Sequence, residues 1–561
     1  MSTLTMSLHT MSDLQTNAAV IALSTLTLVV LYTGLSLLVN YRKCPQIKGP
    51  WLACVSELWL FRSTTAGRMY EDCASFLIAL AGERLTLAIQ GSLARIAPNK
   101  VVTNDPFIWA HMSAPRSRFT KGTWYDPTTL DPNQRNSLSQ RDDKLHSVLR
   151  AKMTRGVGSE TNDDKYSGKD IPALESNIDD RINDMVVLIR NESGAGKPVD
   201  MAKIAQFFTL DVLTQIAFEA PFGYLTKNQD VFQYIQKVQE FLHILELASN
   251  IPTIHRMLSS RIMLRLFGPK PTDKLGMGAM LGVARRVVNE RYAPDAKVKD
   301  DMLGSFKRHG LSRDEAENEA VLQLLGGSDS TATAIRMTFL FILTNPAVYA
   351  KLTSELSAHK GQISSPVIQS AEARELPYLQ SCIKEGLRVF PPLAGLQGKV
   401  SPLGGETVNG YFIPGNIEVG WNPMSMQRRH EIYGEDAEMF RPDRWIEAAA
   451  LDDDGAKLGL MEKTLGLVFG HGKYGCLGKT IALMELDKIF VALFQNFDFA
   501  LVDVVRPVRT FCHGAHLQSD MWVRATERNV SYEAHSLDIR RDSSTTHAPN
   551  QVGYMRSSTT V

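Results

Sequence analysis

The sequence predicts a mainly α-helical protein with small β-sheets, preceded by one membrane-spanning helix. The stretch from Ser312 to Asn345 contains no proline and carries apolar residues along its length, which predicts one long helix. Residues 18–39 carry no charge and form a second long apolar run. The turn pairs Asn409-Gly410 and Pro414-Gly415 separate short segments, which predicts strands between helices.

The long run begins with Ser312, and Glu315 follows it three residues later, a pair typical of the capping box at a helix N-terminus. At ~1.5 Å per residue the run would span about 50 Å, enough to cross a large domain. Gly326 and Gly327 in its middle each cost roughly 1 kcal/mol relative to alanine. A charged Asp329 among buried residues is also costly. These residues indicate either a kink in a core helix or a functional segment.

The loop from Phe469 to Gly478 is punctuated by glycines and carries Cys476. Glycines let the backbone turn tightly and approach a flat ligand closely. An apolar helix is expected directly after Cys476, and its free N–H groups and positive dipole end would stabilise a thiolate, the form of cysteine that binds metal. The alternative is a buried structural cysteine in a glycine-rich turn.

Two further motifs precede this loop. Glu385 and Arg388 are three residues apart, so on a helix they share one face and can pair. The segment Phe440-Arg441-Pro442-Asp443-Arg444 follows them. Taken alone, a Glu-x-x-Arg pair is a common surface feature of little energetic value.

In this order the segments resemble the signatures of the cytochrome P450 family, in which a cysteine thiolate holds the haem iron. The loop matches Phe-x-x-Gly-x-x-x-Cys-x-Gly at Phe469, Gly472, Cys476 and Gly478. The resemblance implies that Cys476 is the axial ligand of haem b (iron protoporphyrin IX), with the other three residues beside the cofactor. It covers roughly residues 45–527.

The family resemblance also implies a role for the paired charges. Glu385, Arg388 and Arg444 would form a buried structural triad that fixes the cysteine loop, without touching substrate. The catalytic domain as a whole would comprise residues 51–527, with the cytochrome P450 fold.

Within the long helix, the resemblance implies an oxygen-activation segment. The glycines would leave room for dioxygen, and Asp329, Ser330 and Thr331 would relay protons. The chain departs from the family pattern at Ser330, where threonine is usual. Serine keeps the hydroxyl but loses the β-branch that restrains χ1. We therefore expect proton delivery to survive, with more oxygen wasted as peroxide and Thr331 as a partial substitute.

His146 and Arg150 lie four residues apart on one face of a helix expected from residue 143 to 153. They are either surface polar residues or, as the resemblance implies, ligands of the haem propionates. Lys399 stands where the family usually has arginine. Tyr474 stands where the family usually has arginine or histidine. A lysine cannot offer a fork of donors, and a tyrosine offers only a neutral hydroxyl. Propionate binding is thus expected to depend on His146, Arg150 and Lys399.

The motif Gly-Lys-Tyr-x-Cys-Leu-Gly-Lys around Cys476 is similar to loops of filamentous-fungal P450s, such as the pisatin-demethylase-like group. It indicates a fungal source.

Residues 18–39 would cover about 33 Å at ~1.5 Å per residue, which matches a hydrocarbon core of ~30 Å. A buried core helix is the alternative. The basic residues Arg42, Lys43 and Lys48 follow the apolar run, so the positive-inside tendency places residues 1–17 in the lumen and the body in the cytosol. The resemblance implies a single-pass anchor in the endoplasmic-reticulum membrane.

The segments that flank the expected domain have distinct compositions. Residues 40–50 combine basic residues with Pro45 and Pro50, which predicts a stiff hinge after the anchor. Residues 528–561 are rich in Ser, Thr and charge, which predicts a disordered tail.

The composition excludes several classes of function. Lys plus Arg total 61 and Asp plus Glu total 60, a formal net charge of +1, so no nucleic-acid partner is expected. The six cysteines are scattered without zinc-type spacing, which suits free thiols in a reducing compartment.

Together, the motifs and the resemblance predict a haem-thiolate monooxygenase. It would insert one oxygen atom from O2 into a lipophilic small molecule, such as a terpenoid, polyketide or alkaloid of secondary metabolism. Electrons would come from NADPH through NADPH–cytochrome P450 reductase, with cytochrome b5 as a second candidate donor. Two alternatives remain: a P450-fold isomerase or dehydratase that needs neither O2 nor reductase, and a non-catalytic haem-binding protein.

Overall fold

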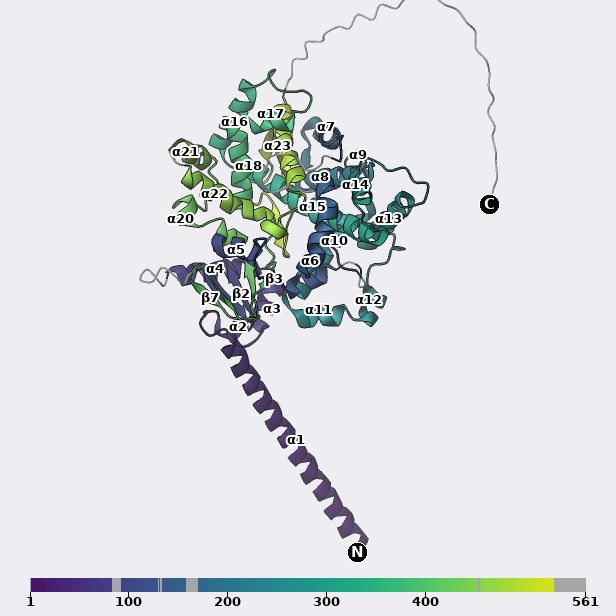
Figure 1. Ribbon diagram of the computed structural model, residues 1–561, viewed down its shortest axis with the longest axis vertical. Coiled ribbons are helices and arrows are strands. Elements are labelled where there is room, and N and C mark those ends of the chain that lie inside the picture. Colours follow the sequence, from purple (N-terminus) through teal and green to yellow (C-terminus); the bar gives the residue numbers. More distant parts are fainter. Residues whose placement is uncertain are drawn as a thin grey trace, which may run out of the picture.

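Helix α15 (Arg313–Leu343) runs through the body of the protein, for which we describe a computed structural model (Figure 1). The Glu315 N–H donates to the Ser312 side chain and the Ser312 N–H donates to the Glu315 side chain, so the predicted capping box is confirmed. Most side chains from Ser328 to Ile342 are buried. They are buried because α8 (Met201–Phe218), α18 (Pro377–Val389) and α23 (Lys479–Asn496) pack around α15.

The structure describes residues 2–82, 92–129, 131, 134–157, 170–451 and 455–528. The other helices of these residues are α1 (Ser2–Arg42), α2 (Trp51–Val55), α3 (Leu58–Thr65), α4 (Met69–Gly82), α5 (Pro106–Ser113), α6 (Asp143–Val157), α7 (Leu174–Glu192), α9 (Tyr224–Lys227), α10 (Tyr234–Asn250), α11 (Pro252–Leu258), α12 (Arg261–Phe267), α13 (Gly276–Arg291), α14 (Met302–Arg308), α16 (Pro346–Ala358), α17 (Ser370–Arg374), α19 (Pro423–Met426), α20 (His430–Tyr433), α21 (Asp443–Leu451) and α22 (Ala456–Gly466). Short 3-10 helices are η1 (Thr123–Thr128), η2 (Gly194–Gly196), η3 (Val231–Gln233), η4 (Leu467–Phe469) and η5 (Gly472–Tyr474). The predicted mainly α fold is confirmed.

The strands form small sheets, as predicted. The largest of those described has the order β1-β2-β8-β5-β3, with β2 and β8 parallel and its other pairs antiparallel. Three smaller sheets have the orders β10-β11, β4-β12-β9 and β6-β7. The strands are β1 (Leu93–Ala97), β2 (Lys100–Thr103), β3 (Thr120–Lys121), β4 (Pro198–Asp200), β5 (Lys399–Val400), β6 (Glu406–Val408), β7 (Tyr411–Ile413), β8 (Glu418–Trp421), β9 (Phe497–Leu501), β10 (Arg509–Cys512), β11 (His516–Ser519) and β12 (Trp522–Glu527).

The pairing of β3 with β5 sets up part of the functional site. Lys121 of β3 lies directly opposite Lys399 of β5 in the antiparallel register. Two like charges at opposed positions repel each other, so this pairing needs a compensating partner.

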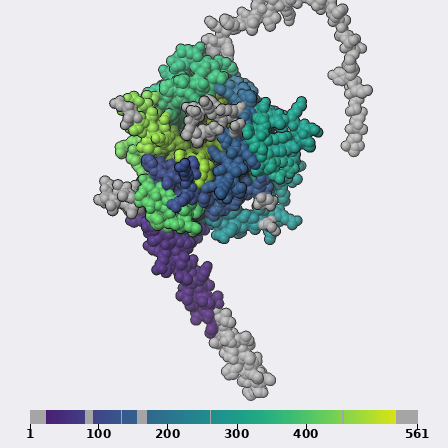
Figure 2. Space-filling model, viewed as in Figure 1, coloured from purple at the N-terminus to yellow at the C-terminus, as the bar shows by residue number. Residues whose placement is uncertain are grey.

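Helix α1 projects from the body as a straight rod (Figures 1 and 2). Residues Leu23–Arg42 are long and apolar enough to cross a membrane, and none of this stretch is buried in the protein. The guanidinium of Arg95 in β1 donates to the carbonyl oxygens of Asn40 (2.6 Å), Tyr41 (3.0 Å) and Cys44 (3.1 Å). Arg95 therefore satisfies the free carbonyls at the end of α1 and ties that end to the sheet. The predicted tail, residues 528–561, lies outside the described residues except for Arg528.

Candidate active site

The cysteine loop connects α22 to α23 through two short turns, η4 and η5. Its backbone requires glycine at residue 472, where φ is +54° and a Cβ atom would lie 2.3 Å from the carbonyl oxygen of Ser113. The Cys476 N–H donates to the Phe469 carbonyl oxygen at 2.6 Å, which closes the loop. The loop is thus pressed against the end of α5 and cannot accept a side chain at residue 472.

The thiol of Cys476 is open to solvent, although protein atoms surround its other sides. The N–H groups of Gly478 and Lys479, at the start of α23, point to its sulfur as the sequence predicted. Desolvation by these surroundings nevertheless outweighs the N–H groups and the nearby Arg150 guanidinium, and it raises the pKa of the thiol. The helix N–H groups therefore lower the pKa of the thiol as expected, but desolvation by the surrounding protein outweighs them. Coordination to a metal ion would have to remove the proton.

The two glycines in α15 have different surroundings. Gly326 is exposed in the middle of the helix, and a Cβ atom there would meet no atom of the described residues within 4 Å. A Cβ atom on Gly327 would lie 3.0 Å from a methyl group of Leu213 in α8. Gly326 therefore borders open space, whereas Gly327 allows α8 and α15 to pack closely.

The residues after these glycines point in different directions. Asp329 is buried near Gln206 of α8 and Arg336, and desolvation raises the pKa of its carboxyl to about 6. The hydroxyl of Ser330 is partly accessible and donates to the Gly326 carbonyl oxygen at 3.0 Å. Thr331 is buried and lines a small cavity together with Gly478. This cavity brings the predicted oxygen-activation segment next to the residues that follow Cys476.

Arg150 and His146 project from α6 toward the cysteine loop. A Cβ atom on Gly475 would lie 3.9 Å from the Arg150 guanidinium, and the ring centroids of His146 and Tyr474 are 5.5 Å apart. Burial, with the positive charges of Lys121, Arg150 and Lys473, lowers the pKa of His146 to about 3. His146 is therefore a neutral ring at physiological pH.

Lys399 and Lys121 approach the same tyrosine from β5 and β3. Their ammonium nitrogens lie 5.4 Å and 5.3 Å from the centroid of the Tyr474 ring, and that of Lys399 is 3.3 Å from the centroid of the Trp109 ring. Burial and neighbouring lysines lower the pKa of Lys399 well below its ordinary value. Burial and the charge of Arg150 lower that of Lys121 to about 7. Within the described ranges, neither lysine has a carboxylate within ion-pair distance.

Tyr474 does not offer its hydroxyl to the open space. The hydroxyl donates to Asp143 Oδ1 at 2.6 Å, and the ammonium group of Lys473 donates to Asp143 Oδ2 at 2.7 Å. We call the side chains around this ring the basic cluster, which comprises Lys121, His146, Arg150, Lys399, Lys473 and Tyr474.

The arrangement fits a haem group. In the part of the chain that the structure describes, no three His, Cys, Asp or Glu side chains gather as a metal site. A single accessible thiol suits an iron whose other ligands belong to a porphyrin. Beside that thiol, the basic cluster holds cations in excess of carboxylates, and two propionates would balance them.

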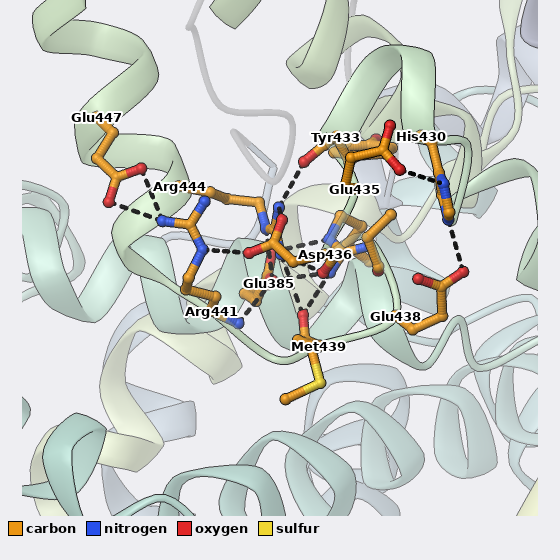
Figure 3. Close-up of polar contacts among 12 residues, drawn as sticks. Glu385, His430, Tyr433, Glu435, Asp436, Glu438, Met439, Arg441, Arg444 and Glu447 are labelled. Carbon is orange, nitrogen blue, oxygen red and sulfur yellow. Dashed lines mark hydrogen bonds and ion pairs between the residues drawn. The ribbon is translucent and has the colours of Figure 1, made fainter.

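The predicted triad lies in a separate, closely packed region (Figure 3). Glu385 accepts from Arg388 through two bonds of 2.8 Å, and from the Arg444 guanidinium at 2.9 Å. Glu385 and Arg388 are wholly buried, and Arg444 almost so. Trp445 Nε1 and the Arg441 N–H also donate to the Glu385 carboxylate, at 2.9 Å and 2.8 Å.

The two arginines hold the backbone that leads to α21. Arg388 donates to the carbonyl oxygens of Gln427, Ala437 and Met439, and Arg444 donates to those of Tyr433, Asp436 and Met439. The triad therefore fixes the segment from α19 to α21 against α18.

Comparison with known proteins identifies the family. The sequence profile described as Cytochrome P450 matches residues 100–519, most of the chain. The chain is a cytochrome P450. It is 37% identical over 516 residues to the cytochrome P450 monooxygenase ABA1 of Pyricularia oryzae, covering 90% of this chain and 96% of that protein. It is also 37% identical to the monooxygenase aba1 of Botryotinia fuckeliana (85% and 90% covered), and 35% identical to abl1 of Leptosphaeria maculans (83% and 80% covered). The enzyme therefore belongs with fungal P450 monooxygenases.

The sequence did not reveal three residues of this P450 site. Lys121 was an isolated lysine outside every motif, and Asp143 was one of many acids at a helix start. Glu485, which lines the small cavity with Thr331 and Gly478, belongs to the apolar helix after Cys476, where one acid among apolar residues was the only available signal.

Proposed function

We propose that this P450 inserts one oxygen atom from O2 into a lipophilic small molecule, with electrons from NADPH delivered by a reductase. The observation that carries the proposal is the accessible thiol of Cys476, in a loop that shares a cavity wall with the Asp329–Thr331 segment. When bound, the haem would activate O2, and its thiolate ligand would favour cleavage of the O–O bond.

In this proposal, residues of α15 relay protons and leave room for dioxygen. Gly326 leaves room beside α15, and the Ser330 hydroxyl can accept a proton while it donates to the Gly326 carbonyl oxygen. Asp329, whose pKa is about 6, can both gain and lose a proton near neutral pH. An acid and a hydroxyl on one turn of α15 support monooxygenation over an isomerase that needs no external protons.

The basic cluster would hold the haem propionates. Arg150 of α6 and Lys399 of β5 would supply positive charge to the propionates. Lys121 of β3, which lies opposite Lys399 in the strand pair, would add to this charge. His146 is neutral and would donate a hydrogen bond. Gly472 and Gly478 would let the porphyrin lie close to the loop, and Phe469 would pack near the thiolate and tune its potential.

The substrate is expected to be lipophilic, because the segments near the site are largely apolar. Phe119, just before β3, and Tyr125, within η1, are buried, and so are Leu322 and Leu324 on α15. A terpenoid, polyketide or alkaloid would suit such a pocket. Similarity to fungal P450 monooxygenases supports a place in secondary metabolism.

Helix α1 would anchor the enzyme in the endoplasmic-reticulum membrane. Residues 1–17 would lie in the lumen, residues 40–50 would form the hinge, and residues 51–527 would form the catalytic domain in the cytosol. The exposed apolar surface of α1 and the basic residues Arg42, Lys43 and Lys48 after it support this orientation.

The test uses the full-length protein in membranes with an added NADPH–cytochrome P450 reductase, with and without cytochrome b5. We expect a ferrous carbonyl spectrum typical of a thiolate ligand, its loss in Cys476→Ala, and O2-dependent NADPH oxidation with a lipophilic substrate library. A thiolate spectrum without O2 consumption would favour the isomerase, and no turnover at all would favour a haem-binding protein.

A further inference from the structure

Glu418 is a buried acid of the largest sheet that the proposed mechanism does not use. It begins β8, and only 5% of its surface is exposed. Its carboxylate accepts from the Thr123 hydroxyl and from the Trp124 N–H, both at 3.1 Å, so it holds the first turn of η1. The ammonium group of Lys100, opposite it in β2, lies 3.5 Å from Glu418 Oε2 and is also buried. Lys100 and the two donors of η1 therefore balance the charge of this carboxylate.

Two glycines from different segments make room for the Glu418 side chain. The Gly122 N–H donates to the Gly398 carbonyl oxygen at 2.8 Å, which brings the start of η1 beside β5. A Cβ atom at either residue would collide with the Glu418 carboxylate. Gly122 has a φ of −82°, which any residue can adopt, so the lack of a side chain is what this position requires. The chain is thus shaped to let Glu418 reach η1.

Lys100 connects the same ion pair to α10. Its ammonium group donates to the carbonyl oxygen of Asn250, the last residue of α10, at 2.8 Å. The wholly buried Asn250 side chain in turn donates to the Thr64 hydroxyl of α3 at 3.0 Å. Because α10 also packs against η1, two neighbouring segments are bonded to one buried ion pair.

The segment η1 reaches the basic cluster. The ammonium group of Lys121 lies 5.1 Å from the ring centroid of Tyr125 in η1, and 5.3 Å from that of Tyr474 in the cysteine loop. The Tyr125 hydroxyl donates to the Gln397 carbonyl oxygen at 3.0 Å, two residues before Lys399. A shift of η1 would therefore change the space beside the site that we assign to the haem.

We propose that Glu418 is a positioning residue that, with Lys100, couples η1 to the end of α10 and so sets which ligands fit between these segments and the haem. The effect on ligand selection rests on the proposed function, whereas the coupling does not. Without the carboxylate, the Trp124 N–H and the Thr123 hydroxyl would lose a charged acceptor in a buried place, which is costly. Both segments would then be free to move apart.

The coupling is tested by hydrogen–deuterium exchange of the full-length protein without turnover. In Glu418→Gln we expect faster exchange in residues 119–129 and also in residues 242–251, at the end of α10. In the described part of the chain, the ion pair reaches this second segment through Lys100. Lys100→Met should affect the same two segments, and the double variant should exceed neither single variant by much, because the two residues act as a unit.

The matched control is Asp301→Asn. Asp301 is also a buried acid paired with one cation, Arg291, and it caps α14. This variant should lose stability but leave exchange in η1 and α10 as in the wild type. Faster exchange in only one of the two segments of Glu418→Gln, or in both segments of the control, would overturn the coupling.

The effect on ligand selection is tested on the holoenzyme with imidazole and phenylimidazole, whose nitrogen binds haem iron and shifts its absorption spectrum. The dissociation constant of the small imidazole should be the same in wild type and Glu418→Gln. For phenylimidazole we expect it to rise about tenfold, since a hydrogen bond to a charged group is worth roughly that factor or more. The ferrous carbonyl spectrum should be unchanged, and Glu418→Asp, which keeps the charge, should recover part of the affinity.

An equal rise for both probes, or no rise for phenylimidazole, would refute the role in ligand selection. A wild type without the thiolate spectrum would instead refute the proposed function, and hydrogen exchange would still decide whether Glu418 couples η1 to α10.

Discussion

Two groups of buried charged side chains, the triad and the basic cluster, differ in how their charges are balanced. In the triad, Glu385 accepts from two guanidinium groups, and both arginines also bind backbone carbonyl oxygens. In the basic cluster, Lys121 and Lys399 face each other across a strand pair without a carboxylate in ion-pair contact among the described residues. A balanced group needs nothing further, whereas an unbalanced group lowers stability until a ligand supplies the missing charge or a lysine releases its proton.

Substitution within the triad should have the largest effect on the free energy of unfolding. Replacing Arg388 by methionine leaves the wholly buried Glu385 with one cation fewer, and removal of one partner of a buried pair costs about 3–5 kcal/mol. We expect the free energy of unfolding to fall by that amount in both apoprotein and holoprotein, with loss of soluble protein at 37 °C.

The matched control is Arg313→Met, because Arg313 forms an exposed pair with Asp314. Exposed pairs are worth about 0–1 kcal/mol, so this variant should unfold like the wild type. Equal destabilisation in the two variants would mean that the triad has no special structural role.

Substitution of Lys399 should stabilise the apoprotein but weaken haem binding. Replacing it by methionine removes a buried amine whose charged form is disfavoured by burial and by neighbouring lysines, so we expect the free energy of unfolding of the apoprotein to rise. The same variant should retain less haem, because a propionate loses its counter-charge. Thermal unfolding of the apoprotein and haem content per chain are the two measurements, and the exposed Lys274 replaced by methionine is the control. A variant that is less stable in both forms would refute this interpretation.

The lowered pKa of Lys121 predicts that the stability of the apoprotein depends on pH. This pKa of about 7 lies below the ordinary value of 10.5, so between these values the unfolded chain holds a proton that the folded chain has released. Stability of the apoprotein should therefore rise with pH from about 7 to about 10. Bound propionates favour the charged form of the lysine and should flatten this rise.

Because tyrosine and cysteine side chains also titrate in this window, the measurement is the difference between the wild type and Lys121→Met. Urea unfolding of the apoprotein at several pH values should give a difference that shrinks as pH rises. A difference that is constant with pH would show that Lys121 keeps its ordinary pKa.

The triad was easier to predict from the sequence than the basic cluster. Glu385 and Arg388 are three residues apart on a helix, and the position of Arg444 follows a recognisable motif, so all three could be named. The sequence also singled out Cys476, because glycines at fixed spacing around a cysteine are rare, and its role as haem ligand stays a prediction. Local spacing was sufficient in each case.

The remaining features depend on contacts between distant segments. The register that sets Lys121 opposite Lys399 is fixed by the pairing of β3 with β5, which no local pattern encodes. The bond from Tyr474 to Asp143 depends on how α6 approaches the cysteine loop. The different roles of Gly326 and Gly327 depend on Leu213 of α8. Likewise, the raised pKa of the Cys476 thiol reflects desolvation by the whole fold, which outweighs the helix N–H groups.

Substitution of Ser330 should have the smallest effect on the free energy of unfolding. It tests whether a hydroxyl that donates to a carbonyl oxygen of its own helix can still relay protons. Its hydroxyl donates to the Gly326 carbonyl oxygen at 3.0 Å, a contact within one turn of α15 that leaves its lone pairs available. Threonine would keep this bond, and its β-branch would restrict χ1. We therefore expect Ser330→Thr to form more product per NADPH and less peroxide, with the free energy of unfolding changed by no more than about 0.5 kcal/mol. Ser330→Ala should have the opposite effect on coupling at similar stability. If both variants couple like the wild type, proton delivery does not pass through this hydroxyl, and Asp329 would have to act through water or through Thr331.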